Sequence, residues 1–89
     1  MEPIQIPIED VIDLHQFSAK EIPYLLKDYL SVCREKNLLT VRIIHGKGLG
    51  ILKKRVLEFL EKSPAVESYG SAPADAGGWG ATVVTLKPK

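Results

Sequence analysis

Leu39–Gly50, which reads LTVRIIHGKGLG, decides the fold. Its first half, through Ile44, is β-branched and apolar, and such a run is typical of a buried strand. Its second half alternates glycine with His45 and Lys47, which predicts a tight turn. Apolar residues after this turn recur at helical spacing until Pro64 ends the pattern. The stretch therefore predicts a strand that passes through a glycine-rich turn into a helix.

A similar strand and helix precede this stretch. Val11–His15 predicts a short strand that ends in polar residues. Ser18 and Glu21 form a capping-box pattern, in which each side chain pairs with the backbone N–H of the other residue, so we expect a helix to begin at Ser18. The helix should bury one apolar face and end near Lys36-Asn37.

Two further strands are predicted after the second helix, a weaker one from Val66 to about Ala72 and a last one at Ala81–Leu86, with a loop at Pro73–Gly80 between them. The order is then β-α-β-α-β-β. Helical crossovers join the first three strands, which should therefore be parallel. Because such crossovers are right-handed, both helices should cover one face of the sheet. The short last connection predicts an antiparallel fourth strand. We expect a two-layer α/β domain with a mixed four-stranded sheet over residues 9–89, after an extended lead-in at 1–8.

The composition is that of one small globular domain: 89 residues, 45% hydrophobic and 26% charged. Cys33 is the only cysteine, which excludes an intrachain disulfide and a thiolate metal cluster. Neither a signal-peptide pattern nor an apolar run of membrane-spanning length is present. We therefore expect a cytoplasmic protein without a membrane partner, either a monomer or a weak dimer.

The net charge of +1 is unevenly distributed. Residues 1–39 carry four basic and seven acidic residues, whereas residues 40–62 carry six basic and two acidic ones. The middle third is therefore the expected anion-binding part. Lys53, Lys54 and Arg55 lie there, just after the predicted helix start, and either contact a phosphate backbone or form an ordinary solvated helix face.

Three polar or glycine-rich segments should meet at one edge of the sheet. In open α/β sheets, ligands bind beyond the carboxyl ends of the parallel strands. Asp13 and His15 end the first strand, and the His45–Gly48 segment ends the second. An antiparallel fourth strand would bring Gly77–Gly80 to the same edge. This convergence is the main functional indication from the residues alone.

Each segment also has a purely structural interpretation. Asp13 and His15 point the same way on a strand, which suits a shared metal ion or an Asp that orients a His, but equally a surface Asp beside a packed His. The glycine turn lacks the spacing of a P-loop and of a dinucleotide-binding fingerprint. Its structural interpretation is a tight strand-to-helix turn, which explains the glycines but not His45 and Lys47 together. Trp79 either stacks on a base or packs on the sheet edge.

The segments Ile12–His15, Ile43–Gly48 and Gly77–Val84 together resemble the small MutS-related (Smr) domain, over roughly residues 9–86. The resemblance implies the fold of the C-terminal domain of translation initiation factor three, and nicking endonuclease activity on DNA or cleavage of RNA. It places the chemistry on Asp13, His15 and His45. Four glycines fall on the positions that shape the backbone of the family, namely Gly46, Gly48, Gly78 and Gly80. Gln16 departs from the family pattern, which has glycine after the first His.

These observations predict a nicking endonuclease acting on DNA or structured RNA, or alternatively a module that binds such nucleic acid without cleaving it. In the enzyme, His45 would act as general acid or base, and Asp13 would orient His15 or hold a divalent metal such as magnesium or manganese. The scissile phosphate would rest on Lys47 and on the amides of 46–50. The full set of expected nucleic-acid contacts is Gly46, Lys47, Gly48, Gly50, Lys53, Lys54, Gly77, Gly78, Trp79 and Gly80.

Overall fold

The computed structural model describes residues 10–46, 50–76 and 78–89, so the lead-in predicted at 1–8 lies outside it. The described chain forms one four-stranded sheet in the order β1-β2-β4-β3. Its strands are β1 (Val11–Asp13), β2 (Thr40–Ile44), β3 (Val66–Ser71) and β4 (Ala81–Leu86). β1 pairs with β2 in parallel, and β4 lies antiparallel between β2 and β3. The first three strands thus run in one direction and the fourth runs against them, as predicted.

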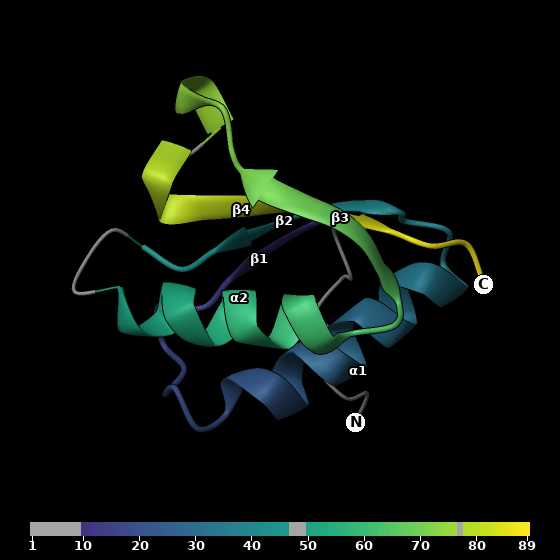
Figure 1. Cartoon of the computed structure of the whole chain (residues 1–89), viewed down its shortest axis with the longest axis horizontal. Helices are drawn as coiled ribbons and strands as arrows, with labels where there is room; N and C mark the ends of the chain where they lie inside the picture. The colour runs from purple at the N-terminus through teal and green to yellow at the C-terminus, as the bar shows by residue number, and fades with distance from the viewer. Residues whose placement is uncertain (1–9, 47–49, 77) are drawn as a thin grey trace, which may run out of the picture.

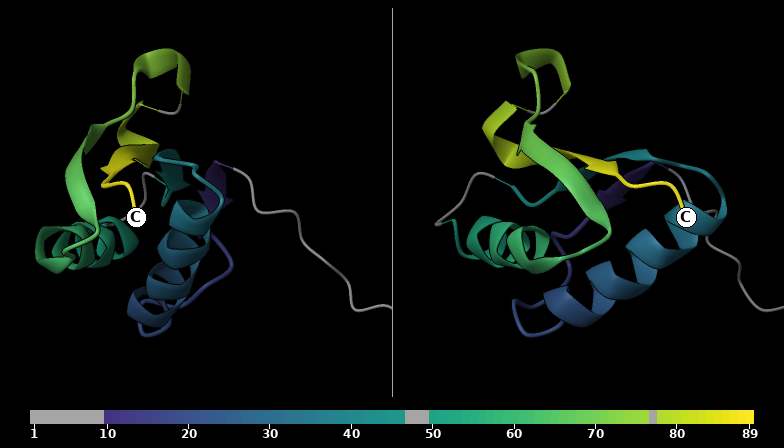
Figure 2. Two further views of the ribbon diagram at one scale, coloured as in Figure 1. Left: turned by 90° about the vertical axis from the view of Figure 1, so that its right-hand side faces the viewer. Right: turned by 45° about the vertical axis from the view of Figure 1, so that its right-hand side comes forward.

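Two helices cover the same face of this sheet. α1 (Ile22–Glu35) connects β1 to β2, and α2 (Ile51–Lys62) connects β2 to β3 (Figure 1). The further views place both helices on one side of the strands, which confirms the predicted two-layer α/β architecture (Figure 2). No helix in the described part of the chain is long and apolar enough to cross a membrane.

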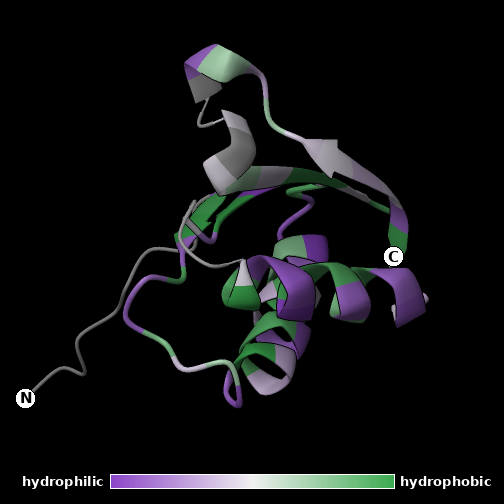
Figure 3. Cartoon of the chain, turned by 60° about the vertical axis from the view of Figure 1, so that its left-hand side comes forward, coloured by the Kyte–Doolittle hydropathy of each residue, from purple (hydrophilic) through white to green (hydrophobic). Residues whose placement is uncertain are grey.

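The core lies between the helices and the sheet. Alternate residues of β2 (Val41 and Ile43) point to the helices and are buried, because successive strand residues face opposite sides. Leu26 on α1 and Val56 on α2 are fully buried against them. Colouring by hydropathy shows largely hydrophobic central strands, while α2 alternates between hydrophobic and hydrophilic residues around its turns (Figure 3). Burial of these apolar faces therefore fixes the helices on the sheet.

The first helix begins later than the capping-box pattern predicts. Glu21 does accept a hydrogen bond of 2.8 Å from the backbone N–H of Ser18. However, residues 18–21 form turns with bonds to the third preceding residue, and the helix starts at Ile22. Pro23 explains this difference, because it has no N–H with which to extend the helical ladder back toward Ala19. The predicted capping contact is thus real, but it closes a turn before the helix.

The end of this helix agrees with the prediction. Asn37 adopts a φ of 61°, in the left-handed region where asparagine is one of the few tolerated residues besides glycine. The next residue, Leu38, donates its backbone N–H to Cys33 O at 2.8 Å. This bond satisfies a carbonyl that the helix end would otherwise leave unpaired. The chain is thereby turned toward β2.

Candidate active site at the sheet edge

The structure brings the three predicted segments together at one edge of the sheet. Leu14, just after β1, donates its backbone N–H to Ile44 O at 2.8 Å. The N–H groups of His45 and Gly46 both donate to Gly80 O, each at 2.9 Å, and so join the end of β2 to the start of β4. Both helices begin at this same end of the molecule (Figure 1). Asp13 and His45 thus lie at the same end of neighbouring strands.

Asp13 and His15 form a hydrogen-bonded pair on this edge. Asp13 Oδ1 accepts the backbone N–H of His15 at 2.9 Å and lies 2.5 Å from His15 Nδ1. The backbone N–H of His15 is the largest cause that lowers the pKa of the Asp13 carboxyl, and the His15 side chain adds to it. A carboxylate at this distance fixes the proton on Nδ1, so the other nitrogen, Nε2, is available to accept one. The predicted orientation of His15 by Asp13 is therefore present in the structure.

The other ring nitrogen of His15, Nε2, faces Gly46. A Cβ atom placed on Gly46 would come within 2.7 Å of His15 Nε2, closer than any real contact allows. Gly46 also adopts a φ of +80°, a conformation that side-chain-bearing residues rarely adopt. Glycine at this position therefore serves two purposes, because it permits the turn and leaves space for the His15 ring.

His45 has a different environment from His15. His45 as a whole is only 4% exposed, whereas the side chains of His15 and Asp13 are 58% and 59% exposed. His45 Nε2 lies 2.9 Å from Oγ1 of Thr82, which is itself buried, and Nδ1 lies 3.1 Å from Gly46 O. Burial lowers the pKa of His45, and the charges of Lys53 and His15 lower it further. The ring is therefore held neutral inside the domain.

These contacts define the tautomer of His45. A carbonyl oxygen can only accept, so Nδ1 carries the proton, and in a neutral ring Nε2 must then accept from the Thr82 hydroxyl. Thr82 lies within the segment Gly77–Val84, but the sequence alone assigns it no role. The signal for burial was present, because His45 continues the two-residue alternation of Val41 and Ile43 on the helix-facing side of β2.

The glycine turn differs in one respect from the expected phosphate cradle. The Gly46 amide was expected to bind phosphate, but in this structure it donates to Gly80 O. Gly50 has a φ of +79° and caps α2, whose first N–H groups have no partner within the helix. Lys53 and Lys54 lie on that first turn. Anion binding at this edge is therefore expected from the start of α2 rather than from Gly46.

The remaining predicted residues are only partly described. Lys47, Gly48 and Gly77 lie outside the described residues. Gly78 adopts a φ of +52° at the start of a short 3-10 turn, η2 (Gly78–Gly80), and for Trp79 only the backbone in this turn is described. A second short turn, η1 (Ala74–Ala76), precedes it, and the two project from the sheet on the side away from the helices (Figures 1 and 2).

The donor set at this edge is small for a metal ion. Among the described residues, no group of three or more His, Cys, Asp and Glu side chains could hold one. Asp13 supplies a single carboxylate, one oxygen of which already pairs with His15. Magnesium or manganese takes six ligands, most of them oxygens, so water and substrate phosphates would have to complete its shell here.

Comparison with known proteins identifies the family. The family model of the Smr domain matches residues 12–87, which include the whole four-stranded sheet except Val11. The chain belongs to the Smr family. Endonuclease MutS2 of Clostridium beijerinckii is 39% identical over 80 residues, and that of Thermus thermophilus 38% over 77 residues. These matches cover 90% and 86% of the chain but only 10% of either relative. This Smr chain therefore spans about a tenth of the length of these relatives.

Two solved structures share the fold of this Smr chain. The Smr domain of Thermus thermophilus MutS2 superposes with a TM-score of 0.83 at 37% identity, over 88% of this chain and 98% of that one. YdaL, a stand-alone small MutS-related protein from Escherichia coli, superposes with a TM-score of 0.82 at 26% identity, over 88% of this chain and 64% of that one. The Smr fold thus occurs both as part of a longer protein and as a separate one.

Proposed function

We propose that this Smr domain binds nucleic acid at the sheet edge and hydrolyses phosphodiester bonds, acting as a nicking endonuclease on DNA or structured RNA. The observation that carries the proposal is the exposed Asp13–His15 pair, in which His15 Nε2 faces Gly46. The MutS2 relatives, which are described as endonucleases, support the reaction class.

His15 would transfer the proton in this reaction. As a general base, Nε2 removes a proton from the attacking water while the new oxygen–phosphorus bond forms and the bond to the leaving oxygen breaks. The leaving oxygen takes up a proton from solvent water as it departs, and His15 returns its own proton to solvent afterwards. Asp13 keeps the imidazole in the required tautomer and stabilises its charged form, as an aspartate does in other histidine-dependent sites.

His45 would act indirectly, by holding the backbone at Gly46 in its conformation. Its ring is buried and both of its nitrogens are engaged, so it offers no free nitrogen to a substrate at the surface. The earlier assignment of proton transfer to His45 stays a prediction, but the geometry favours His15. The phosphate would be bound by the first amides of α2 together with Lys47, Lys53 and Lys54.

Incubation of the purified chain with supercoiled plasmid and with structured RNA tests the proposal. We expect nicked plasmid or discrete RNA fragments, and a loss of both in the His15→Gln variant. A parallel reaction with chelator decides whether the reaction needs a divalent metal. Tight binding without cleavage under any added metal would contradict the enzyme and favour a non-catalytic binding module. In that outcome the Gln16→Gly variant, which restores the family pattern, tests whether Gln16 is the cause.

A further inference from the structure

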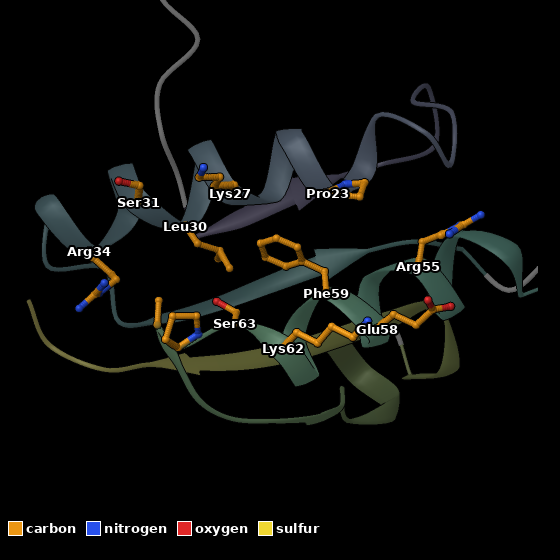
Figure 4. A pocket seen from close by; sticks show the side chains of 12 residues that line it. Pro23, Lys27, Leu30, Ser31, Arg34, Arg55, Glu58, Phe59, Lys62 and Ser63 are labelled. Carbon is orange, nitrogen blue, oxygen red and sulfur yellow. The ribbon is translucent and has the colours of Figure 1, made fainter.

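A groove on the helical layer is separate from the sheet edge. It lies between α1 and α2 and ends at Ser63–Ala65, beyond the end of α2, with a cavity volume of about 490 Å³. None of its lining residues belongs to the proposed active site. Figure 4 shows Leu30 and Phe59 pointing toward each other between the two helices, with the strands of the sheet behind them.

The floor of this groove is apolar. Leu30 from α1 is 2% exposed and Phe59 from α2 is half-buried, and Pro23, Pro64 and Ala65 extend the surface. A volume of 490 Å³ falls in the range of roughly 300–1,000 Å³ that is usual for binding clefts. An apolar side chain of a partner would therefore be removed from water on entering between the helices.

The rim of the groove is strongly basic. Its charged residues are Lys27, Arg34, Arg55 and Lys62, against the single carboxylate of Glu58. The whole chain has a net charge of only +1, so positive charge is concentrated at this groove. Arg34 donates hydrogen bonds to Lys87 O at 2.9 Å and to Pro88 O at 3.4 Å. Because both acceptors are neutral carbonyls, they do not neutralise its positive charge. Among the described residues, none of the rim cations takes part in the Glu35–Lys89 ion pair or in the Asp13–His15 pair.

From this combination we infer that the groove binds an acidic, amphipathic helical segment of a partner protein. Such a segment would place two or three apolar side chains over Leu30 and Phe59 and its carboxylates against the basic rim, which is the helix-in-groove mode of recognition. A nucleic-acid backbone fits less well, because surfaces that bind it are more polar and would leave this apolar floor uncovered. The inference is independent of the reaction proposed for the sheet edge.

The test is an NMR titration of the isotope-labelled full chain with a synthetic helical peptide. The peptide carries leucines at positions i, i+3, i+4 and i+7 and glutamates on its other faces. We expect saturable shifts centred on Leu30, Phe59 and Ala65, with weaker binding at higher salt. A matched peptide with lysines in place of the glutamates should not bind. Equal binding of both peptides, or no binding of the acidic peptide at millimolar concentration, would overturn the inference.

Charge variants locate the contact. Combining Lys27→Glu with Lys62→Glu turns attraction into repulsion at two rim positions and should weaken the acidic peptide by roughly fivefold or more. Lys20→Glu is the matched control, since Lys20 is exposed and lies outside the groove, and it should leave peptide affinity unchanged. Ser31→Glu adds a negative charge at the groove without removing an apolar side chain, so its expected loss of affinity does not depend on a destabilised core.

Two other occupants would give distinct results. If the Lys27→Glu, Lys62→Glu variant lost plasmid or RNA binding instead of peptide binding, the groove would be a nucleic-acid surface. If the same resonances shifted with protein concentration alone, a second copy of the chain would occupy it. Either result would contradict the proposed partner.

Discussion

The buried bond between His45 and Thr82 gives a quantitative prediction. Replacing Thr82 with Val keeps the shape of the side chain but removes the hydroxyl that lies 2.9 Å from His45 Nε2. Thr82 is 1% exposed and His45 is 4% exposed, so water cannot readily replace the lost partner. An unsatisfied buried polar group costs about 1–3 kcal/mol of folding free energy.

For a domain of this size, each kcal/mol lowers the melting temperature by roughly 4–8 °C. The variant should therefore melt at least a few degrees below the parent, and denaturant unfolding followed by circular dichroism should show the same loss of free energy. Thr85→Val is the matched control, because Thr85 lies on the same strand but faces the opposite side of the sheet and is partly exposed. Its effect should stay within about 0.5 kcal/mol. Equal stability of the two variants would refute the inferred role of Thr82 in holding His45.

Two further predictions concern the same edge of the sheet. Gly46→Ala should destabilise the fold by about 1–2 kcal/mol, because Gly46 has a positive φ. The new methyl group should also displace the His15 ring and reduce cleavage. Unchanged stability and cleavage would show that His15 does not lie over Gly46 in solution. Because burial lowers the pKa of His45, the unfolded chain binds a proton at this residue more readily than the folded chain does. The free energy of unfolding should therefore be highest above pH 6.5 and fall as the pH drops below that value. His45→Gln should weaken this acid sensitivity in unfolding measurements between about pH 7 and 5, and an identical pH dependence in parent and variant would contradict it.

Much of the fold could be predicted from the sequence because each element has a strong local pattern. The last strand was predicted and found at the same residues, Ala81–Leu86, since β-branched residues between a glycine segment and the tail leave few alternatives. The position of β4 between β2 and β3 was not predicted, because periodicity defines an element but not its neighbours. The predicted helix start at Ser18 was too early, because the hydrogen bond between Ser18 and Glu21 closes a turn and Pro23, which was expected to be tolerated in the first turns, cannot extend the ladder back to Ala19.

The candidate site shows the same limit. Residues of β1, β2 and β4 could be placed at one edge from topology alone, because parallel strands end together. Their individual environments could not, because burial of His45 and exposure of His15 depend on packing between distant segments. Gly46 was expected to shape the turn, but the His15 ring that lies over it comes from a different strand and leaves no trace in the sequence around Gly46.

The division of roles between the two histidines is tested most directly by single-turnover cleavage with His15→Gln and His45→Gln, each compared with nucleic-acid affinity of the folded variant. If His15 transfers the proton, its replacement should lower the cleavage rate by roughly 10²–10⁴-fold at unchanged affinity, whereas His45→Gln should mainly lower stability. Full-rate cleavage by His15→Gln, together with loss of cleavage in folded His45→Gln, would contradict this account and assign the proton transfer to His45.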